Sequence, residues 1–199
     1  MANRQYDEMR TAAVARLCGA DPRAIAERTG MTYDANANAL LLESFGKPVR
    51  LDCETWAAQP SLEMWHHLAL LQYLDGADGG VPGAEWIGLS EIAGGGQSRG
   101  ASFDREIDEL VARNLSGAEP ERIHAACRAL GGRILKDVRA DLSAEFDFAP
   151  CWPLRFNLWF ADEEFPASAK VLVNAAVSHC LSLEAAGTVA MLLVREIVV

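Results

Sequence analysis

Apolar residues recur at intervals of three and four in six stretches of the chain, which predicts six helices. Typical end signals frame several of them. Asp21 followed by Pro22 marks a helix start, because aspartate caps free amides and proline fits the first turn. Ser61 and Ser182 are the expected N-caps of two later helices. The predicted helices cover residues 6–17, 22–29, 61–74, 102–115 or 104–115, 120–130 and 182–197.

Two regions instead alternate with the period of two that is typical of strands. Residues 39–45 and 49–53 flank the turn sequence Gly46-Lys47-Pro48 and predict a hairpin. Residues 141–178 alternate in the same way and predict an antiparallel meander, whereas 86–92 fit a short strand or an irregular stretch. Because helices and hairpins are segregated along the chain, we predict an α+β fold, with an antiparallel meander in the C-terminal half packed with several α-helices.

A chain of 199 residues, 50% of them hydrophobic, can bury a core that needs no disulfide or metal to hold it together. We therefore expect a single globular domain over residues 1–199. The residues predicted to be buried in its core are Leu68, Leu71, Phe156, Leu158, Leu172 and Leu192.

The net charge of −10 disfavours partners that are themselves negatively charged. A negative surface repels phosphate groups, so we expect neither nucleic acid nor an anionic membrane as a partner. The longest apolar run near the C-terminus, Val189–Val194, ends at Arg195 and is too short to cross a bilayer. Charged residues at Arg4, Asp7 and Glu8 interrupt any secretory signal, so we expect a protein of the bacterial cytoplasm.

Five cysteines are widely spaced and form no CxxC motif. Their odd number and the expected cytoplasmic location favour reduced thiols. We predict that no disulfide forms and that the cysteines pack as small apolar side chains.

The strongest candidate for chemistry is the segment Trp159–Pro166, where Asp162, Glu163 and Glu164 stand in a row at the end of a predicted strand. Neighbouring like charges raise one another's pKa, and loops at strand ends often carry function. An ordinary solvated turn has the same composition. We take Trp159, Asp162, Glu163 and Glu164 as candidate binding residues. We expect at least one of the three acids to be buried and held by backbone amides or an arginine.

The histidines fit structural roles better than catalytic ones. His66 and His67 are adjacent on a predicted helix, so their side chains diverge and are poor partners for one metal ion. His67 follows Glu63 by four residues, which predicts a surface pair if it does not lie in the core. His124 and Cys127 share a helical face and fit packing, because two ligands are too few for zinc.

Two further motifs have weak chemical signals. His179 and Cys180 would be reactive as a pair, but neighbours in an extended segment point to opposite faces. The stretch Gly94–Gly100, GGGQSRG, matches no nucleotide-binding motif. It predicts a flexible surface loop or a lid over a pocket. We assign no catalytic residue and no metal ligand.

One set of short segments carries a more specific signal. It comprises Leu71–Leu74, Pro82-Gly83, Trp86-Ile87, Leu130–Gly132, Asp141, Pro153-Leu154 and Leu158–Ser168. Together these segments resemble an uncharacterised prokaryotic family, domain of unknown function 3786. The last one is the most specific, because eleven residues of that composition seldom arise by chance.

The resemblance implies a cytoplasmic domain that is common in anaerobes and that in some relatives accompanies iron–sulfur or corrinoid proteins. It implies no established activity and no catalytic residue. The chain has Val173-Asn174 where relatives tend to carry a Phe-Asp pair, so an activity that needs that aspartate would be lost. The chain has no iron–sulfur motif, so a cluster would belong to a partner.

Two functional hypotheses follow. The first is a non-catalytic accessory module that binds a protein partner or a small ligand. The second is a small acid–base or metal-dependent enzyme that uses Asp162, Glu163 and Glu164. Two of these carboxylates in one concave pocket would favour the enzyme, and full exposure would favour the module. The sequence leaves cofactor, substrate and oligomeric state open.

Overall fold

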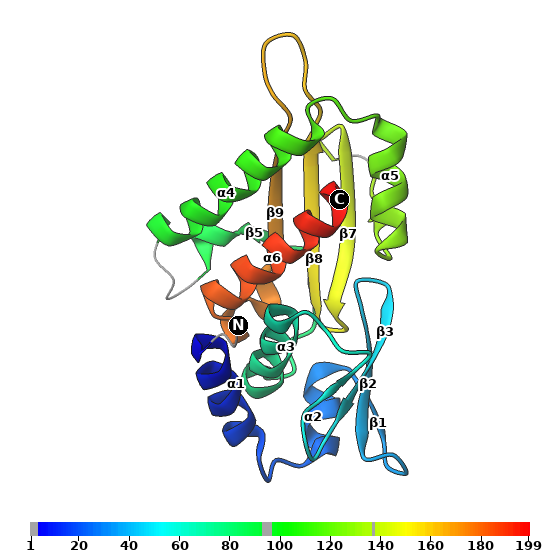
Figure 1. The fold of residues 1–199 in the computed structure, drawn as a ribbon, viewed down its shortest axis with the longest axis vertical. Coiled ribbons are helices and arrows are strands. Elements are labelled where there is room, and N and C mark those ends of the chain that lie inside the picture. Colours follow the sequence, from blue (N-terminus) through cyan, green and yellow to red (C-terminus); the bar gives the residue numbers. More distant parts are fainter. Residues whose placement is uncertain (1–3, 93–96, 137) are drawn as a thin grey trace.

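The computed structural model describes residues 4–92, 97–136 and 138–199, and it contains two antiparallel sheets with helices packed against them (Figure 1). The first sheet has the strand order β1-β2-β3-β4 and is preceded by two helices and followed by a third. These elements are α1 (Arg4–Leu17), α2 (Pro22–Thr29), β1 (Thr32–Asp34), β2 (Ala39–Ser44), β3 (Lys47–Asp52), β4 (Ala58–Gln59) and α3 (Met64–Gly76).

The second sheet has the order β5-β9-β8-β7-β6, and every neighbouring pair is antiparallel. The predicted meander is therefore confirmed, as is the α+β class. The remaining elements are β5 (Trp86–Gly88), η1 (Leu89–Glu91), α4 (Gln97–Leu115), α5 (Pro120–Ala129), β6 (Arg133–Ile134), β7 (Leu142–Ala149), β8 (Trp152–Trp159), β9 (Ser168–Asn174), η2 (Ala175–Cys180) and α6 (Leu183–Val198).

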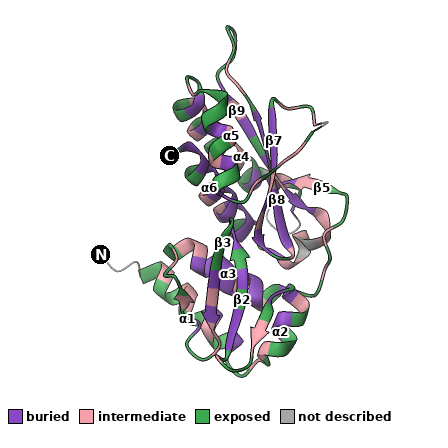
Figure 2. Ribbon diagram, turned by 90° about the vertical axis from the view of Figure 1, so that its right-hand side faces the viewer, coloured by how far each residue is buried: buried purple, intermediate pink, exposed green. Residues whose placement is uncertain are grey.

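Helices α4 and α6 cross one face of the larger sheet (Figure 1), and α5 contacts α6 and the edge strand β6. The buried residues concentrate on the strands and on the helix faces turned toward them (Figure 2). They form one cluster that runs through both sheets. Helix α3 takes part in this cluster over almost its whole length and also contacts α1 and α6. A helix that is apolar on most sides is expected in such a central position.

The β2–β3 hairpin joins the two sheets. Its two turn residues, Phe45 and Gly46, both have positive φ (47° and 70°), as a tight two-residue hairpin turn requires. The Phe45 amide donates to the carbonyl of Asp147 in β7 at 2.9 Å, and its ring packs on Phe148. A Cβ on Gly46 would lie 2.7 Å from the Gly131 nitrogen. This close approach fixes the hairpin against the turn that follows α5.

Local signals in the sequence set the starts of α2 and α6. Asp21 accepts from the Arg23 amide and Ser182 from the Ala185 amide, as predicted for N-caps. The predicted cap at Ser61 is wrong. The Glu63 carboxylate accepts from the amides of Trp65 (2.7 Å) and His66 (3.0 Å), so the helix begins after it.

Helix α4 begins at Gln97, before the predicted starts at Ser102 and Asp104. In its first turn the Arg99 side chain lies 3.3 Å from Glu184 and stacks over the ring of Phe103. These contacts with α6 and with the next turn stabilise a helical start that the local sequence does not signal.

Four of the six predicted core residues are buried: Leu68, Leu71, Phe156 and Leu158. Leu172 and Leu192 are half-buried, so their predicted burial is wrong. Leu172 pairs with Arg155 and therefore shares with it a face of the sheet that carries charge. Leu192 borders a cavity.

Asn174, the last residue of β9, is fully buried. Its amide donates to the Gly83 carbonyl at 2.8 Å and accepts from the Gly83 nitrogen at 3.0 Å. It also caps η2 by accepting from Ala176. An ionised aspartate could not make the donated bond. The asparagine therefore fits a structural role at the end of β9.

All five cysteines, which lie in the described part of the chain, are free, as predicted. Within residues 4–92, 97–136 and 138–199, no helix has the length and apolar character that crossing a membrane would require.

Candidate functional site

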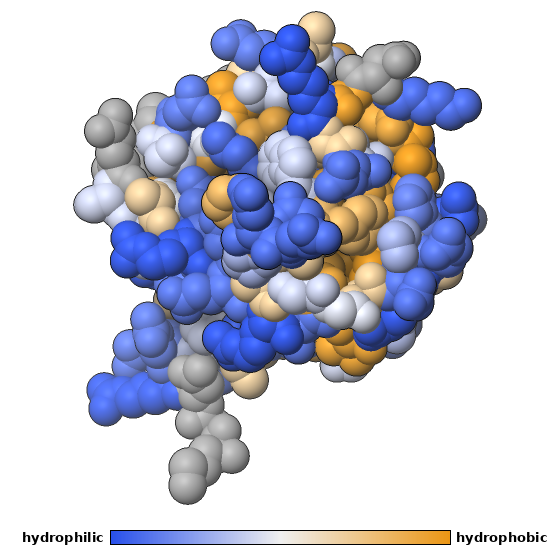
Figure 3. Space-filling model, turned by 90° about the horizontal axis from the view of Figure 1, so that it is seen from above, coloured by the Kyte–Doolittle hydropathy of each residue, from blue (hydrophilic) through white to orange (hydrophobic). Residues whose placement is uncertain are grey.

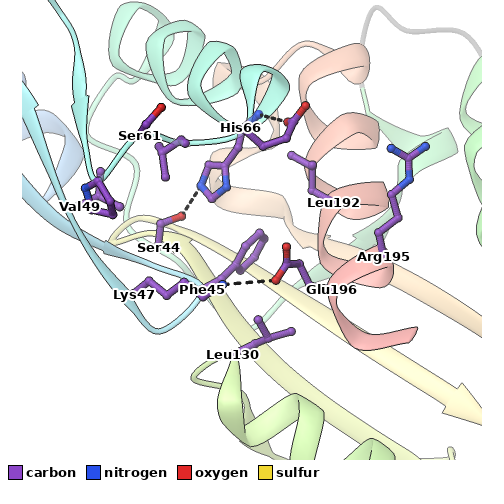
Figure 4. Close-up of a pocket in the computed structure, with 13 residues that line it drawn as sticks. Ser44, Phe45, Lys47, Val49, Ser61, His66, Leu130, Leu192, Arg195 and Glu196 are labelled. Carbon is purple, nitrogen blue, oxygen red and sulfur yellow. Dashed lines mark hydrogen bonds and ion pairs between the residues drawn. The ribbon is translucent and has the colours of Figure 1, made fainter. Parts of the chain in front are cut away.

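A cavity of about 350 Å³ lies where the β2–β3 hairpin, the start of α3, the end of α5 and the last turns of α6 meet (Figure 4). We call it the hairpin cavity. The residues that line it are Ser44, Phe45, Lys47, Val49, Pro60, Ser61, Leu62, Glu63, His66, Leu130, Leu192, Arg195 and Glu196.

Much of the wall of the hairpin cavity is apolar. The rings and alkyl groups of Phe45, Leu130 and Leu192 converge on it from three different elements (Figure 4). Phe45 is buried and belongs to the tight two-residue turn described above, so this part of the wall is built on a fixed backbone. A mostly apolar wall with a few placed polar groups is typical of small-molecule sites.

The polar part of the wall includes a hydrogen bond between Ser44 and His66. The Ser44 Oγ lies 2.8 Å from the His66 Nε2, and the imidazole packs on the rings of Phe45 and Phe148. Burial lowers the pKa of His66 to about 4, with the charge of Lys47 acting in the same direction and that of Glu196 opposing it. The imidazole is therefore neutral at pH 7 and offers hydrogen bonding but no charge.

Charged groups stand at the rim. The Lys47 ammonium lies 3.3 Å from the Glu196 carboxylate, which links the hairpin to α6 (Figure 4). Both side chains are more than half exposed, so the pair contributes at most about 1 kcal/mol to stability. Glu63 is already bound to two amides of its own helix. Arg195 is exposed and forms no hydrogen bond or ion pair with any residue that the structure describes.

A second hollow of about 230 Å³ adjoins the hairpin cavity and shares Leu192 and Arg195 with it. Its other walls include Trp65, Phe103 and Met191. Arg195 therefore stands between two largely apolar hollows along α6.

The four residues predicted as binding residues lie elsewhere. Trp159 ends β8 and is 38% exposed, and Asp162, Glu163 and Glu164 belong to the β8–β9 loop, which projects at the end of the larger sheet (Figure 1). Figure 3 views the molecule from this end and shows a mainly hydrophilic surface with hydrophobic areas between the charged side chains. The structure places the three acids in one loop that follows Trp159, and none of the four residues lines the hairpin cavity.

The expectation that one of these acids would be buried is wrong, because all three are exposed. The expectation of anchoring by backbone amides is confirmed for Asp162. Its Oδ1 accepts from the amides of Glu164 and Phe165, each at 2.8 Å, and these bonds lower its pKa. Phe165 is 66% exposed rather than drawn onto the core, so the loop stays in solvent.

The other candidate residues have mainly structural environments. His67 is buried and its Nε2 lies 2.7 Å from the Trp56 carbonyl, so the predicted surface pair with Glu63 is wrong and the core position is right. Cys127 is buried, which raises the pKa of its thiol to about 12. Among the residues described, no three His, Cys, Asp or Glu side chains are grouped closely enough to hold a metal ion.

Two sequence motifs are described only in part. Gly94–Gly96 and the side chain of His179 lie outside the described residues. The rest of the GGGQSRG stretch is the first turn of α4, so the prediction of a loop as far as Gly100 is wrong. Cys180 Sγ lies 3.1 Å from the Asp78 carboxylate.

Sequence reasoning missed the hairpin cavity. Its residues come from positions 44–49, 60–66, 130 and 192–196, and no local motif links them. The available signal was the predicted hairpin. Its turn consists of Phe45 and Gly46 rather than the predicted Gly46-Lys47-Pro48, so Ser44 and Lys47 pair at the end of the two strands.

Three comparisons with known proteins were informative to different degrees, and only the family comparison gave a match. No curated protein and no solved structure matches the chain. The model of the family described as Domain of unknown function (DUF3786) matches residues 21–196, a span that includes every residue lining the cavity. The chain belongs to this uncharacterised family.

Proposed function

We propose that the protein is a non-catalytic binding module that holds a small organic ligand in the hairpin cavity. The observation that supports this is the cavity itself. Its volume of about 350 Å³ is within the usual range of ligand pockets, roughly 300–1,000 Å³. It combines an apolar wall, a neutral hydrogen-bonding pair at Ser44 and His66, and charges at the rim.

The geometry favours binding over catalysis at this site. Ser44 is only 1% exposed, so its hydroxyl is not presented to a substrate as a nucleophile. The lowered pKa of His66 makes the imidazole a weak base. Their mutual hydrogen bond is instead suited to hold the wall of the cavity in one arrangement.

The alternative hypothesis, an acid–base or metal-dependent enzyme at Asp162, Glu163 and Glu164, has less support. One carboxylate oxygen of Asp162 is already bound by two amides, and all three side chains are exposed. Full exposure fits a binding module better than an enzyme. An accessory role beside iron–sulfur or corrinoid proteins is part of our proposal and rests on the family resemblance.

The proposal is tested with N-phenyl-1-naphthylamine, an uncharged apolar probe whose fluorescence rises when it leaves water. Wild-type protein is expected to bind one probe molecule per chain. The variant Leu192→Trp fills the cavity from α6 and is expected to lower the affinity about tenfold or more. The matched control is Leu41→Trp, on an exposed position of β2 outside the cavity.

Circular dichroism should show the same helix content in all three proteins. The proposal is overturned if wild type does not bind the probe, or if Leu192→Trp binds it as tightly as the control does.

A further inference from the structure

Arg195 is the one rim residue whose charge is not compensated by a neighbour in the described part of the chain. Lys47 is paired with Glu196, and Glu63 is bound to the amides of Trp65 and His66. Arg195 forms no ion pair or hydrogen bond with a described residue, although the chain has ten more acidic than basic residues. A cation left unpaired in an acidic protein, at the edge of a cavity, is available to a ligand.

The position of Arg195 adds a geometric argument. It lines both the hairpin cavity and the adjoining hollow, so a group bound to its guanidinium has apolar wall on two sides. Leu192, one turn earlier on α6, lines both hollows as well. The aromatic side chains of Phe45 on one side and Trp65 on the other extend this apolar surface.

We propose that the ligand is an amphipathic organic acid whose single anionic group binds Arg195 and whose apolar body lies in the hairpin cavity. This inference rests on the proposed binding function and names the chemical class of the ligand. A planar guanidinium suits a carboxylate or sulfonate, which it can bind through two parallel hydrogen bonds.

The neighbouring charges favour one negative charge over two. Glu196 and Glu63 both border the cavity, and each would repel a second negative charge on the ligand. An inorganic phosphate also lacks the apolar body that Phe45, Leu130 and Leu192 would cover. Phosphate and other small dianions should therefore bind weakly.

A matched pair of probes separates the anionic group from the apolar body. 8-Anilinonaphthalene-1-sulfonate carries the same aromatic body as N-phenyl-1-naphthylamine plus one sulfonate. The variant Arg195→Gln is expected to lower the affinity for the sulfonate probe about fivefold and to leave the uncharged probe within about twofold of wild type. The control Arg113→Gln, on an exposed position of α4, should change neither.

Competition then identifies the ligand class. Octanoate is expected to displace the sulfonate probe from wild type at lower concentration than octan-1-ol does, and inorganic phosphate at equal ionic strength is expected not to displace it. Equal losses of both probes in Arg195→Gln, or phosphate that competes as well as octanoate, would overturn the anionic assignment alone. Wild type that binds neither probe would overturn the proposed function as well.

Discussion

The β8–β9 loop and the hairpin cavity show two ways in which polar residues are arranged in this protein. In the loop, Asp162, Glu163 and Glu164 are consecutive in the sequence, and Asp162 is satisfied by the amides of the same turn. In the cavity, Ser44 and His66 are 22 positions apart and satisfy each other. The comparison teaches that a conspicuous local motif can satisfy its own hydrogen bonds within one turn. A site that faces a ligand can instead be assembled from residues of separate elements.

The two regions also differ in the buried residues and backbone contacts that support them. Below the loop, Leu158 in β8 is fully buried while its neighbour Trp159 is 38% exposed, because alternate residues of a strand face opposite sides. Below the cavity, the wall depends on a turn in which a glycine approaches another backbone. The predictions that follow test these dependencies, from the largest expected effect to the smallest.

The largest effect is expected from Leu158→Ala. Removing a fully buried leucine from the central strand of the larger sheet loses apolar contacts and leaves a cavity, which costs about 2–5 kcal/mol. Trp159→Ala removes a larger but partly exposed side chain and should cost less. Urea unfolding followed by circular dichroism measures both. A loss below about 1 kcal/mol for Leu158→Ala would contradict the burial on which the expectation rests.

Gly46→Ala should destabilise the protein by about 3 kcal/mol and abolish binding of N-phenyl-1-naphthylamine. Two causes combine, a positive φ of 70° and a Cβ that would meet the Gly131 nitrogen at 2.7 Å. Gly19→Ala separates them, because Gly19 has a φ of 80° and open space around its Cα. Its cost should be only about 1 kcal/mol, with probe binding kept. Equal effects of the two substitutions would rule out the backbone contact as the cause.

Sequence reasoning recovered those parts of the fold that depend on local signals. The caps at Asp21 and Ser182, the β2–β3 hairpin and the meander all follow from residues close in the chain. It failed where contacts outside the local sequence pattern determine where a helix begins. The Glu63 carboxylate displaced the expected cap at Ser61, and contacts to Phe103 and Glu184 extended α4 backward through Arg99.

The same distinction explains the candidate sites. The loop acids attracted attention because like charges in a row are visible in a sequence, but their burial depends on whether Phe165 packs on the core, and Phe165 is 66% exposed. The residues of the hairpin cavity form no comparable pattern in the sequence. Its position depends on the contact between Gly46 and Gly131 and on the arrival of α6 beside α3, which no short pattern encodes.

The pH dependence of stability should report the burial of His66. Its pKa in the folded protein is about 4, below the ordinary value of 6.5, so the unfolded chain takes up the proton first as the pH falls. The stability from neutral His66 is fully present above pH 6.5 and is lost progressively toward pH 4. The difference between these two pKa values corresponds to a loss of roughly 3 kcal/mol.

The variant His66→Gln keeps a partner for Ser44 and should remove this part of the pH dependence. Urea unfolding at pH 7.5, 5.5 and 4.5 compares its profile with that of wild type. Burial also lowers the pKa of His67, which contributes a decline of the same sign in both proteins. Parallel profiles for wild type and His66→Gln would show that His66 is not the group that the cavity wall keeps neutral.

The smallest effect is expected in the β8–β9 loop. Asp162→Ala removes the acceptor for the amides of Glu164 and Phe165, and these amides are exposed and can bind water instead. Since the same bonds lower the pKa of Asp162, any stability they provide is present above the unfolded pKa and lost as the pH falls through the folded one. Asp162→Asn keeps an acceptor oxygen and should restore the wild-type melting temperature, whereas Glu163→Gln should not change it. If the loop and the cavity are independent, all three variants bind N-phenyl-1-naphthylamine as wild type does; loss of binding in Asp162→Ala alone would show that the turn and the cavity are coupled through the larger sheet.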